Sequence, residues 1–500
     1  MSILPSKRWR TSVFTSFACT LCLLVALSLP AFASAAHTNL VQISSDPFTN
    51  STSQHRTEVE PDTYAFGSTV VATFQSGRFF DGGSSDIGWA TSNDTGNTWK
   101  HGFLPGITVY AGGPYDRVSD PTVAYDAAHH VWQISTLAFN VTSPFADAIL
   151  ISRSSDGLTW DNPVVVQAEA AGTGFDKNWN VCDATATSPF YGHCYVEWDD
   201  SGVILMSTST DGGLTWGSPR TIPGQNFFAI GGQPLVQPTG KVIVPITGLG
   251  SNFSGVVAFT SSDGGASWSS AVPVAPIFTF FEGASIRDGS GLTSAEIDGS
   301  GKVYVVWQDC RFEPNCVINY GSANDIVMST STDGVTWSSV QRIPLDPVGS
   351  NINHIIPGIG VDKRTSGSAA HLALTFYYFT DAACHTFNCQ FDVGFASSTN
   401  GGASWSAKTQ LAGPMNLTWL ADTNQGFMVG DYISTSIVGD DAFPAFAVAS
   451  PPSGGHLNEA MFSVQDTDLK IVGGSLTSKG DAVTVSGTPR PVRAFSRTAR

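Results

Sequence analysis

Several short motifs carry the side-chain types that anion binding and acid–base catalysis require. Arginine guanidinium groups bind a carboxylate through two parallel hydrogen bonds and keep their charge at any working pH. Two carboxyl groups about 5–10 Å apart can share the roles of proton donor and nucleophile or base. The candidates are Arg56, Arg78, Arg311, Asp81, Asp86, Asp120, Glu296 and Tyr432.

Each candidate also has a structural explanation. Glu296 fits a solvated position on a strand, and Asp120 in Asp-Pro-Thr fits a turn before a strand. Arg311 can form an ion pair beside Cys310, and Tyr432 can be an ordinary core tyrosine. The residues alone leave these alternatives open.

Six copies of one short phrase recur along the chain. Each contains Asp, one or two glycines, Thr or Ser, and a final tryptophan, except that the sixth has Asn400 where the others have Asp. The tryptophans are Trp99, Trp160, Trp216, Trp268, Trp337 and Trp405. A fixed phrase that returns every 52 to 69 residues indicates a repeat array with one supersecondary unit per repeat.

Each phrase predicts the turn of a β-hairpin. Apolar alternating runs such as 148–152 and 325–329 enter it, and a shorter run leaves it. Glycine supplies a positive φ, the Asp carboxylate accepts N–H groups of its own turn, and tryptophan fills the space between hairpins. We therefore expect these motifs to be structural and not catalytic.

The elements around the phrases predict a β-propeller. A second hairpin precedes most copies, for example at 120–134, so that each unit has the four short strands of a propeller blade. Six phrases give six blades, and three further strands between 432 and 464 favour a seventh, closed by 39–43. The sequence predicts an all-β protein with six or seven four-stranded blades, seven being favoured.

The termini are expected to lie outside the propeller. Basic residues, the apolar run 13–29 and small residues up to 36 predict a signal peptide over residues 1–36, and hence secretion. A single propeller domain is expected over 37–472 and a Gly/Ser/Thr-rich flexible tail over 473–500. No other apolar run is long enough to span a bilayer.

Cysteine spacing and charge restrict the possible partners. After the leader, six cysteines fall into close pairs that predict three local disulfides, Cys182–Cys194, Cys310–Cys316 and Cys384–Cys389. No Cys or His spacing resembles a zinc site, so no metal and no other cofactor is expected. A net charge of −17 argues against nucleic-acid binding. We expect a monomer.

The phrase Ser-x-Asp-x-Gly-x-Thr-Trp is similar to the Asp box of the sialidase (neuraminidase) superfamily, whose members carry several copies. The chain resembles that family from about residue 56 to residue 440. The segment Arg117–Thr122, Arg-Val-Ser-Asp-Pro-Thr, is close to a family motif whose Asp lines the substrate pocket. The resemblance implies an exo-acting, retaining glycoside hydrolase that removes terminal sialic acid, or a related acidic sugar, from glycans.

The resemblance also implies roles for the candidate residues. In the family an arginine triad holds the sugar carboxylate, an Asp is the acid/base, and a Tyr–Glu pair supplies a nucleophile that is not repelled by an anionic sugar. By resemblance the nucleophile pair is Tyr432 and Glu296, the acid/base is Asp86 or Asp81, and the substrate-binding residues are Arg56, Arg78, Asp120 and Arg311. Arg56 departs from the family pattern, because Thr57-Glu58 follows it instead of Ile-Pro.

Two other functions remain open. A non-catalytic carbohydrate- or cell-surface-binding propeller would scatter the catalytic candidates and present an aromatic patch formed by Phe79, Phe80, Tyr110 and Tyr115. A glycosidase of another specificity would use two carboxylates, such as Asp86 and Glu296, without an arginine triad. Convergence of the candidates on one mouth of the central channel would favour the sialidase hypothesis.

Overall fold

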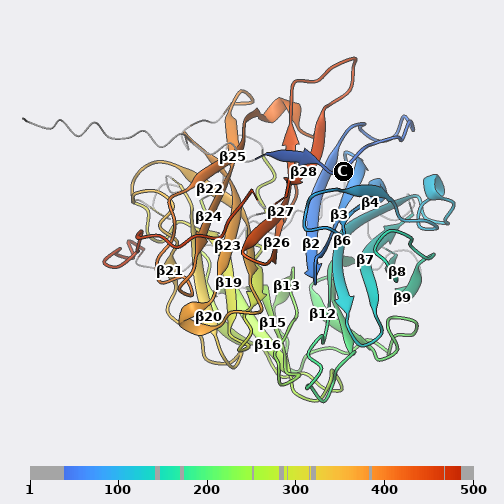
Figure 1. Ribbon diagram of the computed structural model, residues 1–500, viewed down its shortest axis with the longest axis horizontal. Coiled ribbons are helices and arrows are strands. Elements are labelled where there is room, and N and C mark those ends of the chain that lie inside the picture. The colour runs from blue at the N-terminus through green and yellow to red at the C-terminus, as the bar shows by residue number, and fades with distance from the viewer. Residues whose placement is uncertain are drawn as a thin grey trace, which may run out of the picture. The chain divides into compact units, whose positions relative to one another are not determined.

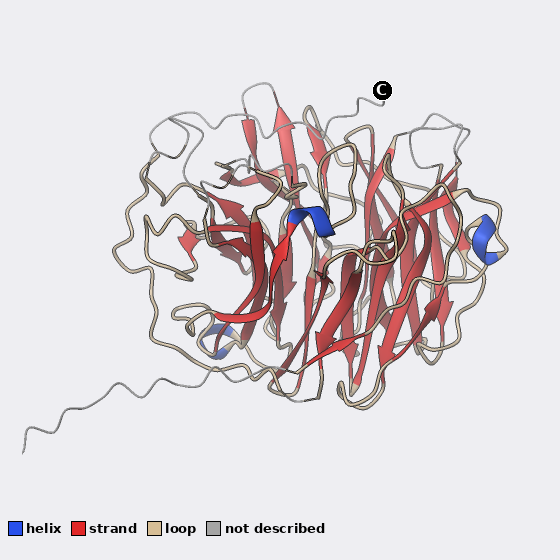
Figure 2. Ribbon diagram, turned by 90° about the horizontal axis from the view of Figure 1, so that it is seen from above, coloured by secondary structure: helices blue, strands red, loops and turns tan. Residues whose placement is uncertain are grey.

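The computed structural model describes residues 39–485 apart from 141–146, 169–173, 251–252, 281–285, 290, 315, 317–322, 382–383, 385 and 467. The predicted signal peptide and the end of the predicted tail lie outside the described residues. The described part is all-β, as predicted (Figure 2). Its helices are single 3-10 turns, η1 (Val109–Ala111), η2 (Gly367–Ala369) and η3 (Leu417–Trp419), and none of them could cross a membrane.

The described strands form six hydrogen-bonded sheets (Figure 1). The largest contains β2 (Glu58–Phe66), β3 (Thr69–Arg78), β4 (Ser84–Ser92), β5 (Lys100–Phe103), β6 (Arg117–Asp126), β7 (Val131–Phe139), β8 (Ala148–Ser154) and β9 (Val164–Ala168). A three-stranded sheet follows, with β10 (Phe175–Cys182), β11 (Cys194–Asp200) and β12 (Val203–Ser209). The next has five strands, β13 (Phe228–Ile230), β14 (Leu235–Val236), β15 (Val242–Gly250), β16 (Phe253–Ser261) and β17 (Val272–Pro276).

The other three sheets have four strands each. One contains β18 (Ser294–Ile297), β19 (Val303–Asp309), β20 (Asp325–Ser331) and β21 (Gln341–Arg342). The second contains β22 (Asn353–Val361), β23 (Leu372–Phe379), β24 (Gln390–Ser398) and β25 (Thr409–Asn416). The last contains β26 (Ser434–Val438), β27 (Asp441–Ala449), β28 (Glu459–Val464) and the first strand of the chain, β1 (Leu40–Gln42). β1 pairs antiparallel with β28, which closes the array as expected.

One inner strand from each repeat lies against the inner strand of the next. β2 contacts β6, β6 contacts β10, β10 contacts β14 and β14 contacts β18. β18 then contacts β22, β22 contacts β26, and β26 returns to β2. Outward from this ring, successive strands pair antiparallel, for example β22 with β23 and β23 with β24. This is the arrangement of a β-propeller, and that part of the prediction is confirmed.

The prediction of six or seven four-stranded blades is corrected by the strand pairing. Five sheets have three to five strands, the size of a blade, and the sixth is a continuous sheet of eight. That sheet is continuous because Ser84 of β4 pairs with Val118 of β6. Beyond β12 the chain returns only for an isolated bridge, in which Arg220 pairs with Met206 of β12. The sheet of β10, β11 and β12 therefore has no fourth strand among the described residues. The spacing of the turn phrases reveals neither feature.

The recurring phrases form turns of the expected kind. In the third copy, Asp211 Oδ1 accepts the N–H of Thr215 at 2.9 Å and Oδ2 accepts its hydroxyl at 2.6 Å. Ser209 donates its hydroxyl to the same carboxylate at 2.9 Å, and Gly213 has a φ of 80°. In the sixth copy the amide oxygen of Asn400 accepts the N–H of the following serine at 2.9 Å in the same way. These side chains hold their own turns together, which supports the structural interpretation.

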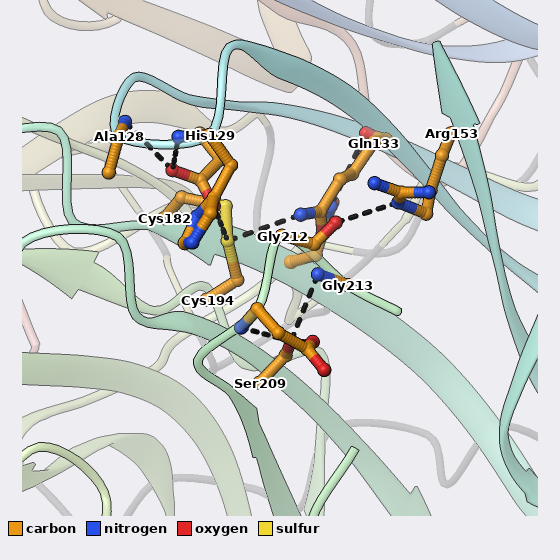
Figure 3. Close-up of a disulfide and its surroundings, with 12 residues drawn as sticks. Ala128, His129, Gln133, Arg153, Cys182, Cys194, Ser209, Gly212 and Gly213 are labelled. Carbon is orange, nitrogen blue, oxygen red and sulfur yellow. Dashed lines mark hydrogen bonds and ion pairs between the residues drawn. A yellow bond between two sulfur atoms is a disulfide. The ribbon is translucent and has the colours of Figure 1, made fainter. Parts of the chain in front are cut away.

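All three predicted disulfides are present. Figure 3 shows Cys182–Cys194, which joins β10 to β11, with Gln133 donating to Cys194 Sγ at 3.3 Å. The carboxylate of Asp126 lies 3.5 Å from the same sulfur and 2.7 Å from His129 Nδ1. Because each of these bonds closes a short loop, they act locally on strand ends and do not link distant sheets.

Candidate functional site

Three charged side chains at the centre of the fold are positioned by β-bulges in inner strands. The pairing register shifts once in each of β2, β6 and β10. At these shifts Glu60, Asp120 and Lys177 have positive φ angles of 59°, 48° and 49°. Pro61 and Pro121 follow the two acids and have no N–H to donate, so the ladder is interrupted there. The bulges bring the three side chains together.

Lys177 is the centre of a cluster of buried charges. Its Nζ lies 2.8 Å from Glu60 Oε1, 2.6 Å from Asp431 Oδ2 and 3.6 Å from Asp120 Oδ1. Arg287 Nε donates to Asp431 Oδ1 at 2.5 Å, and its Nη2 pairs with the other carboxylate oxygen. None of the five side chains is more than 13% exposed. These five residues are called the charged cluster below.

The segment before β26 reaches the charged cluster because Gly430 lets it lie against β2. The N–H of Glu60 donates to the carbonyl of Val429 at 3.0 Å. Gly430 has a φ of 149°, and a Cβ there would stand 2.8 Å from the Cα of Glu60. Only glycine fits this close approach. The next residue, Asp431, is thereby placed next to Lys177.

The charged cluster separates the pKa values of its acids. Burial raises the pKa of Glu60 to about 7; Lys177 opposes the rise, and Asp120 and Asp431 add to it. Burial also acts to raise the pKa of Asp431, but Arg287 and Lys177 hold it below its ordinary value. One acid can therefore keep its proton near neutral pH while its neighbour stays ionised. Active sites divide acid and base roles in this way.

Tyr432 lies beside the charged cluster and lines a small pocket. Its hydroxyl donates to the carbonyl of Pro121 at 3.1 Å, and its ring centroid is 5.2 Å from that of Trp179 and 5.5 Å from Lys177 Nζ. Burial, followed by the surrounding carboxylates, keeps the pKa of Tyr432 well above its ordinary value. Tyr432, Trp179, Lys177 and Gln233 share the pocket. The pocket has a volume of about 10 Å³, which is room for roughly one water molecule beside the cluster.

The three candidate arginines have separate environments. Arg78 is buried and donates from Nη1 to the carbonyl of Gly83 at 2.6 Å; burial lowers its pKa to about 10, with the charged cluster acting on it as well. Arg311 is held by Asp309, through bonds of 2.9 Å from Nε and 2.7 Å from Nη2. Arg56 is exposed.

The candidate acids are also distributed over different places. Asp86 lies on β4, fully buried, and burial raises its pKa well above the ordinary value. Asp81 forms an exposed ion pair with Arg117 at 2.6 Å. Glu296 lies near the end of β18, with its Oε2 3.7 Å from Lys363 Nζ. Tyr432 precedes the start of β26 and has its contacts at the charged cluster, so the structure places Glu296 and Tyr432 at different sites.

The proposed aromatic patch is only partly exposed. Phe79 is buried, with the guanidinium of Arg117 4.2 Å from its ring centroid. Phe80 is 53% exposed, and Tyr110 is 37% exposed. Tyr110 lies 6.2 Å from Phe48, ring centroid to centroid. These rings therefore do not form one continuous exposed surface.

Of the residues at this candidate site, the sequence motifs indicated Asp120 and Tyr432 but not the rest of the charged cluster. No sequence motif singles out Glu60, Lys177, Arg287 or Asp431. One signal was available, because Glu60 and Asp120 are both acids directly before a proline near the start of an inner strand. Lys177 and Arg287 carry no comparable local signal.

Comparison with known proteins gave one family match and distant structural likenesses. Residues 146–356 match the model of the BNR repeat-like domain. No curated protein matches the sequence. The chain is similar to a sialidase from Streptococcus pneumoniae (13% identity, 86% of this chain and 71% of that chain covered, TM-score 0.42). It is also similar to an α-L-arabinofuranosidase from Fusarium graminearum (13% identity, 69% of this chain and 93% of that chain covered, TM-score 0.41). A protein of unknown function from Dyadobacter fermentans is similar as well (13% identity, 70% of this chain and 95% of that chain covered, TM-score 0.42).

The family match and the turns agree with each other. The matched segment 146–356 contains four of the six turn phrases, and their hydrogen bonds are those described above for the third copy. Residues 146–356 thus match a BNR repeat-like domain and carry Asp-box turns on a propeller fold.

Proposed function

We propose that the protein is a glycoside hydrolase whose active site is the charged cluster together with Tyr432. The observation that carries this proposal is the arrangement around Lys177, whose Nζ holds Glu60 and Asp431 together and has Asp120 3.6 Å away. A group of carboxyl groups with separated proton affinities is what glycosidic bond cleavage requires. The BNR repeat-like match over residues 146–356 is consistent with it but does not by itself establish chemistry.

In this proposal Glu60 is the general acid. It keeps a proton near neutral pH and transfers it to the glycosidic oxygen as the bond from that oxygen to the anomeric carbon breaks. Asp120 attacks the anomeric carbon or takes the proton of a water that attacks it; alternatively the phenol of Tyr432 attacks and passes its proton to Asp120. Lys177 and Arg287 are positioning residues, because they hold Asp431 and Glu60 in place. Trp179 offers an apolar ring beside the pocket.

The pairing of the cations in the charged cluster indicates which class of sugar the proposed site would accept. Terminal sialic acid is the substrate that the sequence resemblance implies, and it needs cations that are available to its carboxylate. Lys177 and Arg287 already pair with protein carboxylates. Arg311 is held by Asp309. These pairs favour an uncharged terminal sugar, and sialic acid is the second candidate. The predicted signal peptide and the disulfides support action outside the cell.

The test is turnover of fluorogenic glycosides by the purified protein. The panel contains an α-sialoside, an α-L-arabinofuranoside and neutral hexosides, each assayed with the wild type and with Tyr432→Phe. Turnover of at least one neutral glycoside, lost in the variant, is the expected result. Turnover of the sialoside alone would make the protein a sialidase. No turnover of any substrate by folded protein would contradict the proposal and favour a carbohydrate-binding propeller.

A further inference from the structure

We propose that a groove at the other end of the inner strands is a second carbohydrate-binding site, which takes an uncharged saccharide. The groove has a volume of about 650 Å³ and is lined by the end of β2, the end of β26, the turn after β22, and Glu296 of β18. We call it the distal groove. It lies where these strands end, whereas the charged cluster lies where β2 and β26 begin.

Two aromatic rings from β2 form one wall of the distal groove. Phe66 is 42% exposed, although one side of its ring packs on Tyr125 with the centroids 4.2 Å apart. Tyr64 lies two residues before Phe66 on the same strand, so both side chains point to the same face of the sheet. A ring held from behind and open in front is a ready surface for the apolar face of a sugar.

Two ion pairs supply polar groups beside these rings. Lys363 Nζ lies 3.7 Å from Glu296 Oε2 and 4.7 Å above the ring of Tyr64. Beside it, Arg364 donates to both carboxylate oxygens of Asp362 at 2.9 and 2.8 Å. All four charged residues line the groove. They offer donors and acceptors a few ångströms apart, the pattern that sugar hydroxyl groups match.

The charge balance of the groove indicates an uncharged ligand. Each cation there is next to an anion, Lys363 with Glu296 and Arg364 with Asp362. The two pairs leave no net charge to attract an anionic or cationic ligand. Aromatic surface together with a few placed polar groups is typical of small-molecule sites. An uncharged saccharide presents both an apolar face and many hydroxyl groups, so it fits this surface best.

This inference is independent of the proposed hydrolase activity. It uses different residues, and it is measured by binding and not by turnover. It also gives Glu296 a role that differs from the catalytic one implied by sequence resemblance: its carboxylate accepts hydrogen bonds from the ligand and holds Lys363 in position. A protein that lacked activity could still bind a saccharide here.

The experiment is isothermal titration of the full chain with cellohexaose, xylohexaose, mannohexaose and maltohexaose, and with hexagalacturonate and sialyllactose as anionic comparators. We expect at least one neutral oligosaccharide to bind. Phe66→Ala should weaken that binding at least ten-fold because it removes the exposed ring. Lys363→Met should weaken it at least five-fold because it removes a donor and keeps the length of the side chain.

Two control variants locate the binding. Leu214→Ala removes an apolar side chain, 54% exposed, from a turn elsewhere, and Lys241→Met removes an ammonium group that donates to the Asp333 carbonyl at an exposed site; both should bind as the wild type does. If Phe66→Ala fails to fold in a thermal melt, Lys363→Met decides, because its side chain is 45% exposed. Absence of binding by all four neutral oligosaccharides, equal binding by Lys363→Met, or preference for the anionic comparators would overturn the proposal.

Discussion

At the scale of single residues, Lys177 explains how so many carboxylates can be buried at one point. A buried ion is costly unless it is paired and hydrogen-bonded. Here one ammonium group contacts Glu60 and Asp431 and lies 3.6 Å from Asp120, and Arg287 completes the neutralisation of Asp431. The carboxylates in turn raise the pKa of Lys177 although its burial acts to lower it. The charges therefore depend on each other.

We predict that Lys177→Met destabilises the fold by about 3 kcal/mol, because it removes the cation that Glu60 and Asp431 share and leaves only Asp431 paired, with Arg287. Urea denaturation measures this loss. The matched control is Lys241→Met, which removes an ammonium that donates to the carbonyl of Asp333 at an exposed site. Equal stability of the two variants would show that the cluster does not depend on Lys177.

The same scale shows why sequence reasoning found only part of the site. Asp120 and Tyr432 stand in short motifs that could be recognised directly. Glu60 and Lys177 are placed by β-bulges, where their φ angles are positive inside a strand. The residue type at a position does not predict such a bulge reliably. Arg287 is placed by its pairing with Asp431, 144 positions away, which is a contact of the fold and not of the sequence.

At the scale of elements, the Asp-box turn is a self-contained unit. Its carboxylate accepts N–H and hydroxyl donors from within five residues, so the turn forms wherever the phrase occurs. This locality is the reason that hairpins, and with them the all-β class, could be predicted from the sequence. β4 and β6 join into one sheet through a single residue pair, Ser84 with Val118. No local sequence pattern predicts this pairing.

Removing one box carboxylate should cost a measurable amount of stability. Asp211→Ala leaves the N–H of Leu214 and both donors of Thr215 without their acceptor. We expect a loss of about 1–2 kcal/mol in the free energy of unfolding. Asp161→Ala, at an exposed position after another box, is the control and should change little. A loss of the same size in both variants would argue against the role of the box carboxylate.

At the scale of the whole molecule, several buried acids set how stability depends on pH. Burial raises the pKa of Glu58 to about 8, with the hydroxyl of Ser44 opposing the rise. Burial likewise raises the pKa of Asp62 to about 7, as it does for Glu60. In the unfolded chain these groups titrate near pH 4. The folded state therefore binds more protons than the unfolded state between about pH 4 and pH 8.

It follows that the free energy of unfolding should fall as pH rises through this window. The contribution of the raised acids is complete below about pH 4 and is lost as pH passes 7 to 8. The Asp carboxylates of the Asp-box turns have the opposite effect on stability. Hydrogen bonds from the N–H groups of Thr336 and Val335 lower the pKa of Asp333 to about 2, so the stability that Asp333 contributes is lost as pH falls towards 2. Stability should therefore be highest near pH 4.

Urea denaturation at pH 5 and pH 8.5 checks this expectation. We predict a free energy of unfolding lower by about 3 kcal/mol or more at pH 8.5. Glu58→Gln should reduce the difference, because the amide keeps a partner for Ser44 and does not titrate. A flat profile, or greater stability at pH 8.5, would show that the buried acids are not protonated in the folded protein.

The most direct test of the central claim compares two conservative variants on one substrate. Glu60 lies in the charged cluster and Glu296 lies in the distal groove. On whichever fluorogenic glycoside the wild type hydrolyses, we predict that Glu60→Gln lowers kcat/KM at least 100-fold, because it removes the proton donor. Glu296→Gln should stay within about three-fold of the wild type. The reverse result, with activity lost in Glu296→Gln and kept in Glu60→Gln, would place the active site elsewhere and contradict the account.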